Sequence, residues 1–196
     1  MLGAIKYNLK HLLDFSGRDA RQTFWYYILF LVVLQFLVGM IAIIPSMVTI
    51  MGDTFTAASS GASEEEMEAL MAGNISGMVG QQVWITVAAS LVSCGLFLAA
   101  FVRRLHDAGF TGWIAAIPVA TTLISIWQTF TMIDESIEVA EAAMANGGDS
   151  AAAFAAQQDV SLASLIGYVG YAVVIGFGIL KSQDGPNKYG NAPVQF

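Results

Sequence analysis

The fold is decided by Arg103-Arg104-Leu105-His106-Asp107-Ala108-Gly109-Phe110-Thr111-Gly112-Trp113, a short polar link between two long apolar runs. The link holds two arginines, a histidine and an aspartate, and it contains both basic residues found between Arg21 and Lys181. About 20 apolar residues are enough to span the hydrocarbon core of a bilayer as a helix. Because only a few residues separate the two runs, we expect them to form an antiparallel hairpin of membrane helices.

The composition excludes an ordinary soluble domain. Of the 196 residues, 56% are hydrophobic and only 12% are charged, which is about half the charged share of soluble proteins. Such a chain could not cover a water-facing surface with charges, whereas a bilayer removes that need. The single cysteine, Cys94, excludes an internal disulfide framework and a multi-cysteine metal site.

Four uncharged runs predict an all-α fold: a four-helix transmembrane bundle with a short N-terminal amphipathic helix, forming one integral-membrane domain over residues 1–196. The expected spans lie at about 24–48, 83–102, 111–133 and 160–180. Pro45 is expected to kink or end the first span, and Pro118 to kink the third in its first turns. The fourth run carries four glycines, which predicts that it forms the tightly packed centre of the bundle.

Two segments between the spans differ from them in composition. In residues 53–82, Ser63 and Glu66 form a capping box that predicts a short helix over Glu64–Ala72. The rest of this segment is expected to be a loop loosened by glycines. Residues 134–159 are acidic and rich in alanine, and we expect them to form an external, solvated linker rather than a binding module.

The N-terminal segment 1–15 has apolar residues at helical spacing, which predicts a short amphipathic helix. Such a helix could lie in the headgroup region with its lysines toward anionic lipid, or it could pack on the bundle as an ordinary helix. The sequence leaves both alternatives open. Ser16 is expected to cap the first membrane helix, with Asp19 in its first turn. Residues 25–27, Trp-Tyr-Tyr, predict an aromatic belt at the membrane interface.

The distribution of charge predicts the orientation of the chain. With four spans, the side that holds both termini and the polar link carries all eight basic residues and four acids, a net charge of +4. The opposite side carries eleven acids and no base. Because basic residues concentrate on the cytoplasmic side of membrane proteins, we expect the N-terminus, the C-terminus and the link to be cytoplasmic.

Three motifs on this predicted face support a family resemblance. They are Phe15-x-Gly17-Arg18-x-x-Arg21-x-x-Phe24-Trp25, then Arg103-Arg104-Leu105-His106-Asp107-x-Gly109-x-Thr111-Gly112-Trp113, and Gly185-Pro186-Asn187-Lys188-Tyr189-Gly190-x-x-Pro193. With them the chain resembles the DUF805 family of small bacterial inner-membrane proteins, which more often has serine at the position of Thr111. The two outer segments are longer here than is usual in that family. The resemblance implies a multi-pass protein of the bacterial inner (plasma) membrane with no established activity, and it supplies no catalytic residue.

The first interpretation of the three motifs is structural. Asp107 is expected to pair with an arginine of the first motif or with Arg104, tying the hairpin to the first helix. Two glycines permit a sharp turn, a threonine can cap the next helix, and the C-terminal motif can fold back over the cluster as a lid. The predicted clamp and turn residues are Asp107, Gly109, Thr111, Gly112, Trp113, Asn187, Tyr189 and Gly190.

The second interpretation is anion binding. Arginines near a helix N-terminus favour a phosphate group through bidentate hydrogen bonds and the helix dipole. Lipid headgroups are the nearest source, and basic pockets on the cytoplasmic side of membrane proteins commonly bind anionic lipids. The predicted residues for binding an anion, a lipid or a partner are Arg18, Arg21, Arg103, Arg104, His106 and Lys188.

A catalytic interpretation is disfavoured. His106 and Asp107 are adjacent, and adjacent residues on a helix do not face each other. We expect no catalytic residue, metal or cofactor, and the few basic residues do not indicate nucleic-acid binding. The leading function is a non-enzymatic scaffold or accessory protein that contacts anionic lipid, a second copy of the chain or another membrane protein. The alternative is a small oligomeric transporter, whose pathway would need the weakly polar residues inside the spans.

Overall fold

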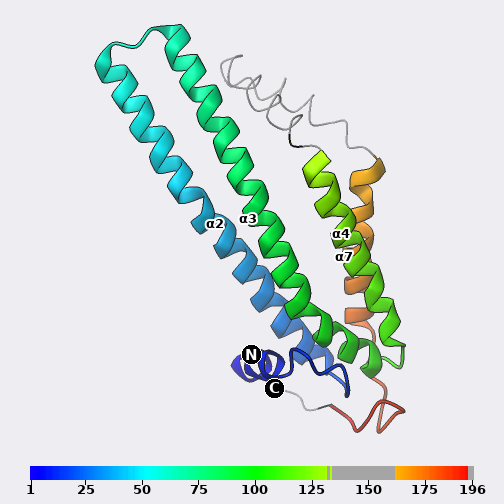
Figure 1. Ribbon diagram of the computed structural model, residues 1–196. Coiled ribbons are helices and arrows are strands. Elements are labelled where there is room, and N and C mark those ends of the chain that lie inside the picture. The colour runs from blue at the N-terminus through cyan, green and yellow to red at the C-terminus, as the bar shows by residue number, and fades with distance from the viewer. Residues whose placement is uncertain (132, 134–161, 194–196) are drawn as a thin grey trace. The chain divides into compact units, whose positions relative to one another are not determined.

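The protein is described here by a computed structural model that covers residues 1–131, 133 and 162–193. Its helices are α1 (Leu2–Lys10), α2 (Arg21–Ser60), α3 (Glu64–Asp107), the 3-10 turn η1 (Gly112–Ala115), α4 (Ala116–Thr131) and α7 (Leu162–Ile179) (Figure 1). In these residues the β pairing is limited to one bridge between Asn187 and Gly190. The predicted all-α fold is confirmed. The acidic segment predicted at 134–159 lies outside the described residues.

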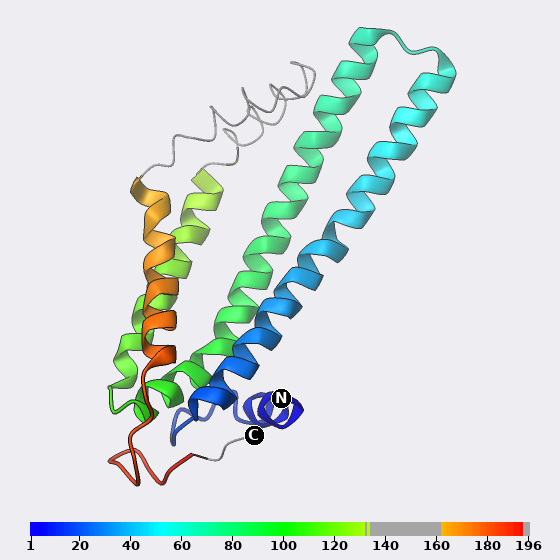
Figure 2. The same ribbon diagram turned by 180° about the vertical axis from the view of Figure 1, so that it is seen from behind.

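The chain divides into two compact units. The first comprises Met1–Phe36, Ala89–Ser125 and Ser164–Phe196, and the second comprises Leu37–Ala88 and Ile126–Ala163. The first unit therefore contains α1, the polar link and the C-terminal tail (Figures 1 and 2). All three motifs singled out in the sequence belong to this unit.

Three helical segments are long and apolar enough to cross a membrane, namely Arg21–Ser60, Glu64–Asp107 and Gly112–Thr131. The apolar stretch Leu165–Ile179 within α7 is shorter than the roughly 20 residues that a span requires. Helix length and composition thus support a membrane protein. The predicted number of four spans is not reached within the part of the chain that the structure describes.

The loop predicted over residues 53–82 is wrong, because α2 continues to Ser60 and α3 begins at Glu64. The reversal takes only three residues, and Gly61 adopts a φ of 76° in it. The predicted capping box is confirmed: the Ser63 amide donates to Glu66 Oε2 at 2.8 Å, and the Glu66 amide donates to Ser63 Oγ at 3.2 Å. The predicted end of this helix at Ala72 is wrong, since each interior glycine costs only about 1 kcal/mol and the 44-residue helix tolerates four of them.

Neither proline ends a helix. Pro45 lies inside α2, which continues for fifteen residues beyond it. Pro118 is the third residue of α4, directly after η1. In the first turn of a helix the missing proline N–H has no intrahelical acceptor to lose, so the residue is tolerated there.

The beginning of α2 also differs from the prediction. The helix starts at Arg21, and the hydroxyl of Ser16 donates to Asp14 instead of capping α2. Arg18 and Asp19 therefore precede the helix rather than occupying its first turn. The segment that leads into α2 brings both side chains to the end of α3, where Arg18 contacts Asp107 and Asp19 lies beside Arg103.

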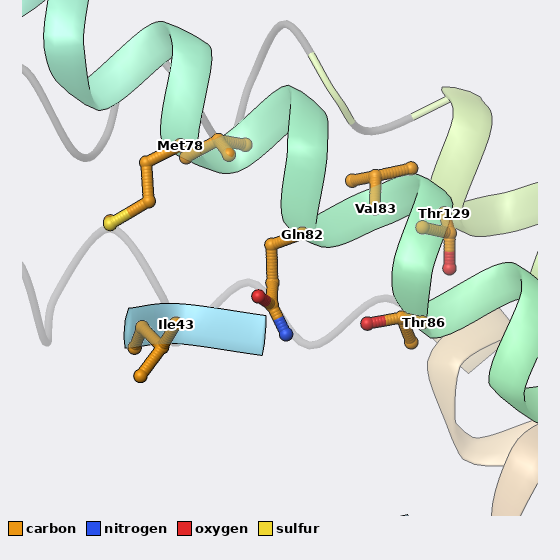
Figure 3. Close-up of a pocket in the computed structure, with 7 residues that line it drawn as sticks. Ile43, Met78, Gln82, Val83, Thr86 and Thr129 are labelled. Atoms are coloured by element: carbon orange, nitrogen blue, oxygen red, sulfur yellow. The ribbon is translucent and has the colours of Figure 1, made fainter. Parts of the chain in front are cut away.

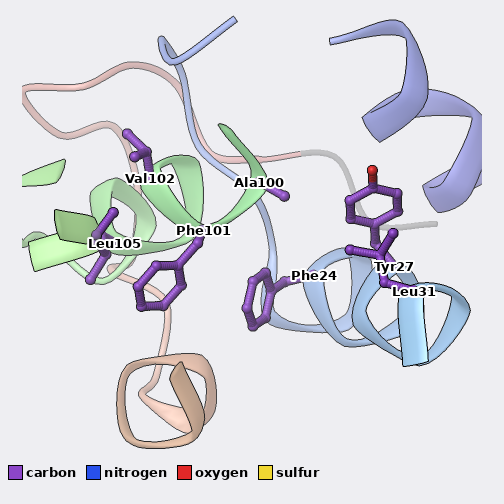
Figure 4. Close-up of a cluster of buried hydrophobic side chains, with 8 residues drawn as sticks. Phe24, Tyr27, Leu31, Ala100, Phe101, Val102 and Leu105 are labelled. Atoms are coloured by element: carbon purple, nitrogen blue, oxygen red, sulfur yellow. The ribbon is translucent and has the colours of Figure 1, made fainter. Parts of the chain in front are cut away.

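A buried apolar cluster joins α2 to α3 within the first unit (Figure 4). Phe24 faces Phe101 with ring centroids 6.0 Å apart, and both side chains are fully buried. Tyr27 is buried as well, and its hydroxyl donates to the Leu96 carbonyl at 3.1 Å. Tyr27 is therefore a core residue, and the prediction that it belongs to an interfacial aromatic belt is wrong.

The four glycines of the fourth run predicted that it forms the tightly packed centre of the bundle. This prediction is wrong for α7. Most of its large side chains, including Tyr168, Tyr171 and Ile175, are exposed. Close contact is restricted to one face, where Gly170 is buried against α4 and the Trp25 indole N–H donates to the Gly178 carbonyl at 3.1 Å. Small residues along a single face permit one close contact, and they do not require contacts all round.

Substitutions at two glycines of α7 should separate close packing from helix propensity. A Cβ added at Gly170 would overlap the Thr121 hydroxyl and lie 3.3 Å from the Pro118 Cα, whereas one added at Gly176 meets nothing within 4 Å. We expect Gly170→Ala to lower the free energy of unfolding by about 1–3 kcal/mol through overpacking. Gly176→Ala, the matched control, should leave it unchanged or raise it by up to about 1 kcal/mol. Unfolding in mixed detergent micelles measures both, and equal effects would contradict the α4–α7 contact.

Candidate functional site

The polar link is a tight helix-ending turn. The Phe110 amide donates to the Leu105 carbonyl at 2.9 Å and the Gly109 amide to the His106 carbonyl at 3.1 Å. This pair of bonds, with Gly109 at a φ of 86°, is the pattern that ends many helices with a glycine. Gly112 is required for a different reason, since a Cβ there would lie 2.9 Å from Val102 Cγ1.

Thr111 begins the next helical segment. Its hydroxyl accepts from the Trp113 amide at 3.5 Å, so the predicted cap is confirmed as a long hydrogen bond. The Trp113 side chain is 84% exposed. It therefore contributes its backbone to the turn, and its indole is not part of a clamp.

The carboxylate of Asp107 is shared by two arginines. Arg18 donates to Asp107 Oδ1 from Nε at 3.1 Å and from Nη2 at 2.9 Å, and Arg104 donates to Oδ2 from Nη1. All three side chains are 0% exposed. The predicted pairing of Asp107 is thus confirmed with both Arg18 and Arg104. Arg21, the third candidate, donates instead to the Ile179 carbonyl at 3.3 Å.

The remaining donors of these two buried arginines bind main-chain carbonyls at the end of α7 and just after it. Arg18 donates to the carbonyls of Gln183 and Gly185, each at 2.6 Å. Arg104 donates to the carbonyls of Gly178 and Leu180. In return, the Gln183 amide donates to the Asp107 carbonyl at 3.0 Å. The approach to α2, the end of α3 and the tail after α7 are therefore held at one point.

The C-terminal motif folds back over this point. Asn187 Nδ2 donates to the His106 carbonyl at 2.9 Å, and the rings of His106 and Tyr189 stack with centroids 3.9 Å apart. Asn187 and Gly190 close the turn by bonding each other's backbone. Lys188 Nζ lies 4.8 Å from the Tyr189 ring centroid and is otherwise exposed. The predicted fold-back of this motif is confirmed, and it covers His106.

Arg103 faces away from this network and binds α1. Its Nη1 donates to the carbonyls of His11 and Asp14, and its Nη2 donates to Asn8 Oδ1 at 2.6 Å. Its Nε lies 3.2 Å from Asp19 Oδ2. The Arg103 side chain is 1% exposed, as is that of Asp19. The sequence did not predict that Asn8 and Asp19 bind Arg103. The one feature that could have indicated it is that both are polar residues next to apolar ones.

Asp19 is the less well satisfied of the two buried carboxylates. Within the described residues, its carboxylate oxygens accept no hydrogen bond, although Arg103 is close enough for an ion pair. Burial raises the pKa of Asp19 and outweighs the lowering effect of Arg103. Asp14 shows the opposite behaviour at the surface, where hydrogen bonds from Ser16 lower its pKa.

The six residues predicted to bind an anion do not form one open site, and His106 is stacked against Tyr189. Arg18, Arg103 and Arg104 are buried and bonded inside the first unit. Arg21 and Lys188 are exposed. Among the residues that the structure describes, no group of three His, Cys, Asp or Glu side chains could hold a metal ion.

A small cavity lies in the second unit (Figure 3). It has a volume of about 220 Å³ and is lined by Ile43, Met78, Val79, Gln82, Val83, Thr86 and Thr129. Figure 3 shows Gln82 on α3 extending toward Ile43 on α2. The lining is mostly apolar, with three polar side chains, those of Gln82, Thr86 and Thr129.

The Asp107 network predicts a large difference between two aspartate substitutions. Asp107→Asn removes the negative charge between two buried arginines, and breaking a buried pair costs about 3–5 kcal/mol. Asp184→Asn is the control. Asp184 is 89% exposed and its partner Lys181 is 77% exposed, and exposed ion pairs contribute little to stability. We expect unfolding in detergent to show a large loss for the first and no resolved change for the second. Similar effects would mean that the buried network does not stabilise the fold.

The raised pKa of Asp19 predicts a pH dependence of stability. Between its ordinary value of 3.8 and the raised native value, the folded protein binds more protons than the unfolded one. Stability therefore rises as pH falls through this window. Relative to Asp19→Asn, the wild type should gain stability as the pH falls toward the ordinary value of 3.8, by at most about 1.4 kcal/mol per pH unit. The comparison cancels other carboxylates such as Asp14, and a difference that stays constant with pH would contradict the assignment.

Comparison with known proteins assigns the family. A family model described as a protein of unknown function, DUF805, matches residues 12–191. No curated protein and no solved structure matches the chain. The matched region contains the Asp107 network, the polar link and the folded-back C-terminal motif, and it covers most of the chain. The resemblance seen in the three motifs is confirmed, and the chain belongs to the DUF805 family.

Proposed function

We propose that this protein is a non-enzymatic scaffold or accessory protein of the bacterial inner membrane, with both termini in the cytoplasm. The cytoplasmic side, which carries the basic residues, would bind anionic lipid or a membrane partner. The observation that carries this proposal is the internal use of the three buried arginines. Their guanidinium groups are bonded to carbonyls and carboxylates of the chain itself, which is the arrangement of a structural clamp.

The anion contacts would therefore fall to the exposed cations. Arg21 and Lys188 are the two members of the predicted set that are exposed. Lys181 is 77% exposed and belongs to the same unit. Exposed lysines and arginines at the ends of membrane helices attract anionic headgroups by roughly 1 kcal/mol each. A surface of this kind favours weak, shared contacts over a deep selective pocket.

The orientation rests on the charge distribution. On the predicted four-span topology, all eight basic residues lie on the side of the link and the termini, and eleven of fifteen acids lie on the other. Basic residues near span ends determine orientation by remaining in the cytoplasm. The helical reversal at Gly61–Ser63 would then face the opposite side of the membrane.

The test of this proposal has two readouts, of which the first is orientation. In a Cys94→Ser background, Glu65→Cys and Asp184→Cys place one thiol in the first turn of α3 and one in the tail. A membrane-impermeant maleimide applied to spheroplasts should label Glu65→Cys alone, and lysis should then allow labelling of Asp184→Cys. The reverse pattern would overturn the orientation.

The second readout is lipid-dependent stability. Phosphatidylglycerol added to the purified protein in neutral detergent should raise the wild-type melting temperature more than phosphatidylcholine does. Arg21→Gln combined with Lys188→Gln should reduce that shift without lowering the melting temperature in detergent alone. Arg18→Ala combined with Arg104→Ala should instead melt early, because both residues belong to the clamp. Equal shifts with the two lipids would contradict the anionic-lipid contact.

A small oligomeric transporter is the second candidate. The cavity in the second unit favours a transporter, because its lining includes three polar side chains. Gln82 and Thr86 belong to α3 and Thr129 to α4, and both helical segments are long enough to cross a membrane. Polar groups inside spans often mark transport pathways. A pathway would need these groups to face one another in an oligomer.

A further inference from the structure

Helix α1 turns its polar side inward. Its buried residues are Ala4 and Asn8, and Asn8 is only 1% exposed because its amide oxygen accepts from Arg103. The amide nitrogen of the same side chain, Asn8 Nδ2, donates to the Ala4 carbonyl at 3.0 Å. The Tyr7 ring lies 5.6 Å from the Arg103 guanidinium carbon. The contact between α1 and the rest of the first unit is thus made by polar groups around one arginine.

Four large apolar side chains of the N-terminal segment are exposed, whereas Ile5 and Leu12 are partly buried. Leu2 is 81% exposed and Leu13 is 89% exposed, and Leu9 and Phe15 are each 42% exposed. Leu2 and Leu9 are seven residues apart and therefore share one face of the helix. An ordinary helix packed on a bundle would bury these leucines and expose Asn8. The observed burial of Asn8 and exposure of Leu2 and Leu9 are the reverse, which favours the interfacial alternative.

Two lysines flank the exposed leucines. Lys6 follows Leu2 by four residues and Lys10 follows Leu9 directly, and both lysines are exposed. A lysine beside an apolar face can keep its stem against hydrocarbon while its ammonium group reaches the phosphates. The exposed side of α1 is therefore both apolar and cationic, which fits the boundary of an anionic bilayer.

The position of α1 within the first unit agrees with this environment. Figures 1 and 2 show α1 nearly end-on where the first turns of α2 are seen from the side, so α1 lies across the helix that follows it. A helix that crosses the end of a membrane-length helix runs along the membrane surface. The exposed apolar residues of α2, such as Leu29 and Val33, belong to the same unit.

We propose that α1 is an interfacial helix that inserts Leu2 and Leu9 into the anionic cytoplasmic leaflet, with Leu13 just beyond its end in the same layer and Lys6 and Lys10 at the phosphates. Arg103 holds the polar side of this helix and so fixes which side meets the lipid. The inference deepens the proposed function, on which its assignment to the cytoplasmic leaflet rests. The burial pattern of α1 supports the lipid contact itself.

Depth-dependent fluorescence quenching of the full-length protein tests this proposal. A nitrobenzoxadiazole label is attached to Leu2→Cys or Leu9→Cys in a Cys94→Ser background, in vesicles of phosphatidylethanolamine and phosphatidylglycerol. Val33→Cys, within α2, serves as the hydrocarbon control, and Asp184→Cys, in the exposed tail, serves as the aqueous control. Lipids with a nitroxide near the glycerol end or near the methyl end of the acyl chain report depth, and iodide reports water.

Labels on α1 should be quenched more by the shallow nitroxide than by the deep one, because interfacial helices bury their apolar face only about 5–10 Å. Iodide quenching should be several-fold weaker than at Asp184→Cys. Lys6→Gln combined with Lys10→Gln should reduce the shallow quenching of the Leu9 label in these vesicles. Lys181→Gln, which removes an exposed cation outside α1, should not.

Two results would overturn the inference. Labels at Leu2 and Leu9 that iodide quenches as strongly as the aqueous control would place α1 in water. Labels protected from both quenchers, with energy transfer between labelled copies, would mean that a second chain covers α1. Either result could occur with an intact phosphatidylglycerol shift that depends on Arg21 and Lys188, so a failure of α1 is distinguishable from a failure of the proposed function.

Discussion

The first unit depends on one buried carboxylate. Two buried guanidinium groups, those of Arg18 and Arg104, share Asp107 as their counter-ion. Burying an isolated ion is very unfavourable, so such a group is stable only when it is paired and hydrogen-bonded. The approach to α2, the end of α3 and the tail after α7 cannot separate without exposing or unpairing one of these charges. A single carboxylate thus makes three distant parts of the sequence interdependent.

The arginines also complete the ends of helices. The last carbonyls of a helix have no intrahelical donor and carry the negative end of its dipole. At the end of α7, the buried Arg104 donates to the Gly178 and Leu180 carbonyls, and at the end of α1, the buried Arg103 donates to the His11 carbonyl. Guanidinium groups suit this role because their five donors can reach several acceptors at once. Arginines used in this way are unavailable to a headgroup, which is why we assign lipid contact to the exposed cations.

The sequence was sufficient to predict the chemistry of the clamp but not its full membership. Asp107 and its arginines could be predicted, because charges between apolar runs need partners and few are available. Asn8 and Asp19 could not, since their burial results from the docking of α1 on Arg103. Nothing in residues 1–15 indicates which side of an amphipathic helix faces protein. That choice is made by an arginine nearly a hundred positions away.

The same reasoning explains why the loop at 53–82 was wrongly predicted. Charge marks where a chain leaves hydrocarbon, but a helix ends only where its backbone bonds find another partner. At 1.5 Å per residue, the 40 residues of α2 and the 44 of α3 are about 60 Å and 66 Å long, against a hydrocarbon core of roughly 30 Å. Each helix is therefore about twice as long as a single crossing of the hydrocarbon requires. Glu64, Glu65 and Glu66 occupy the first turn of α3, where they suit the positive end of its dipole and do not end the helix.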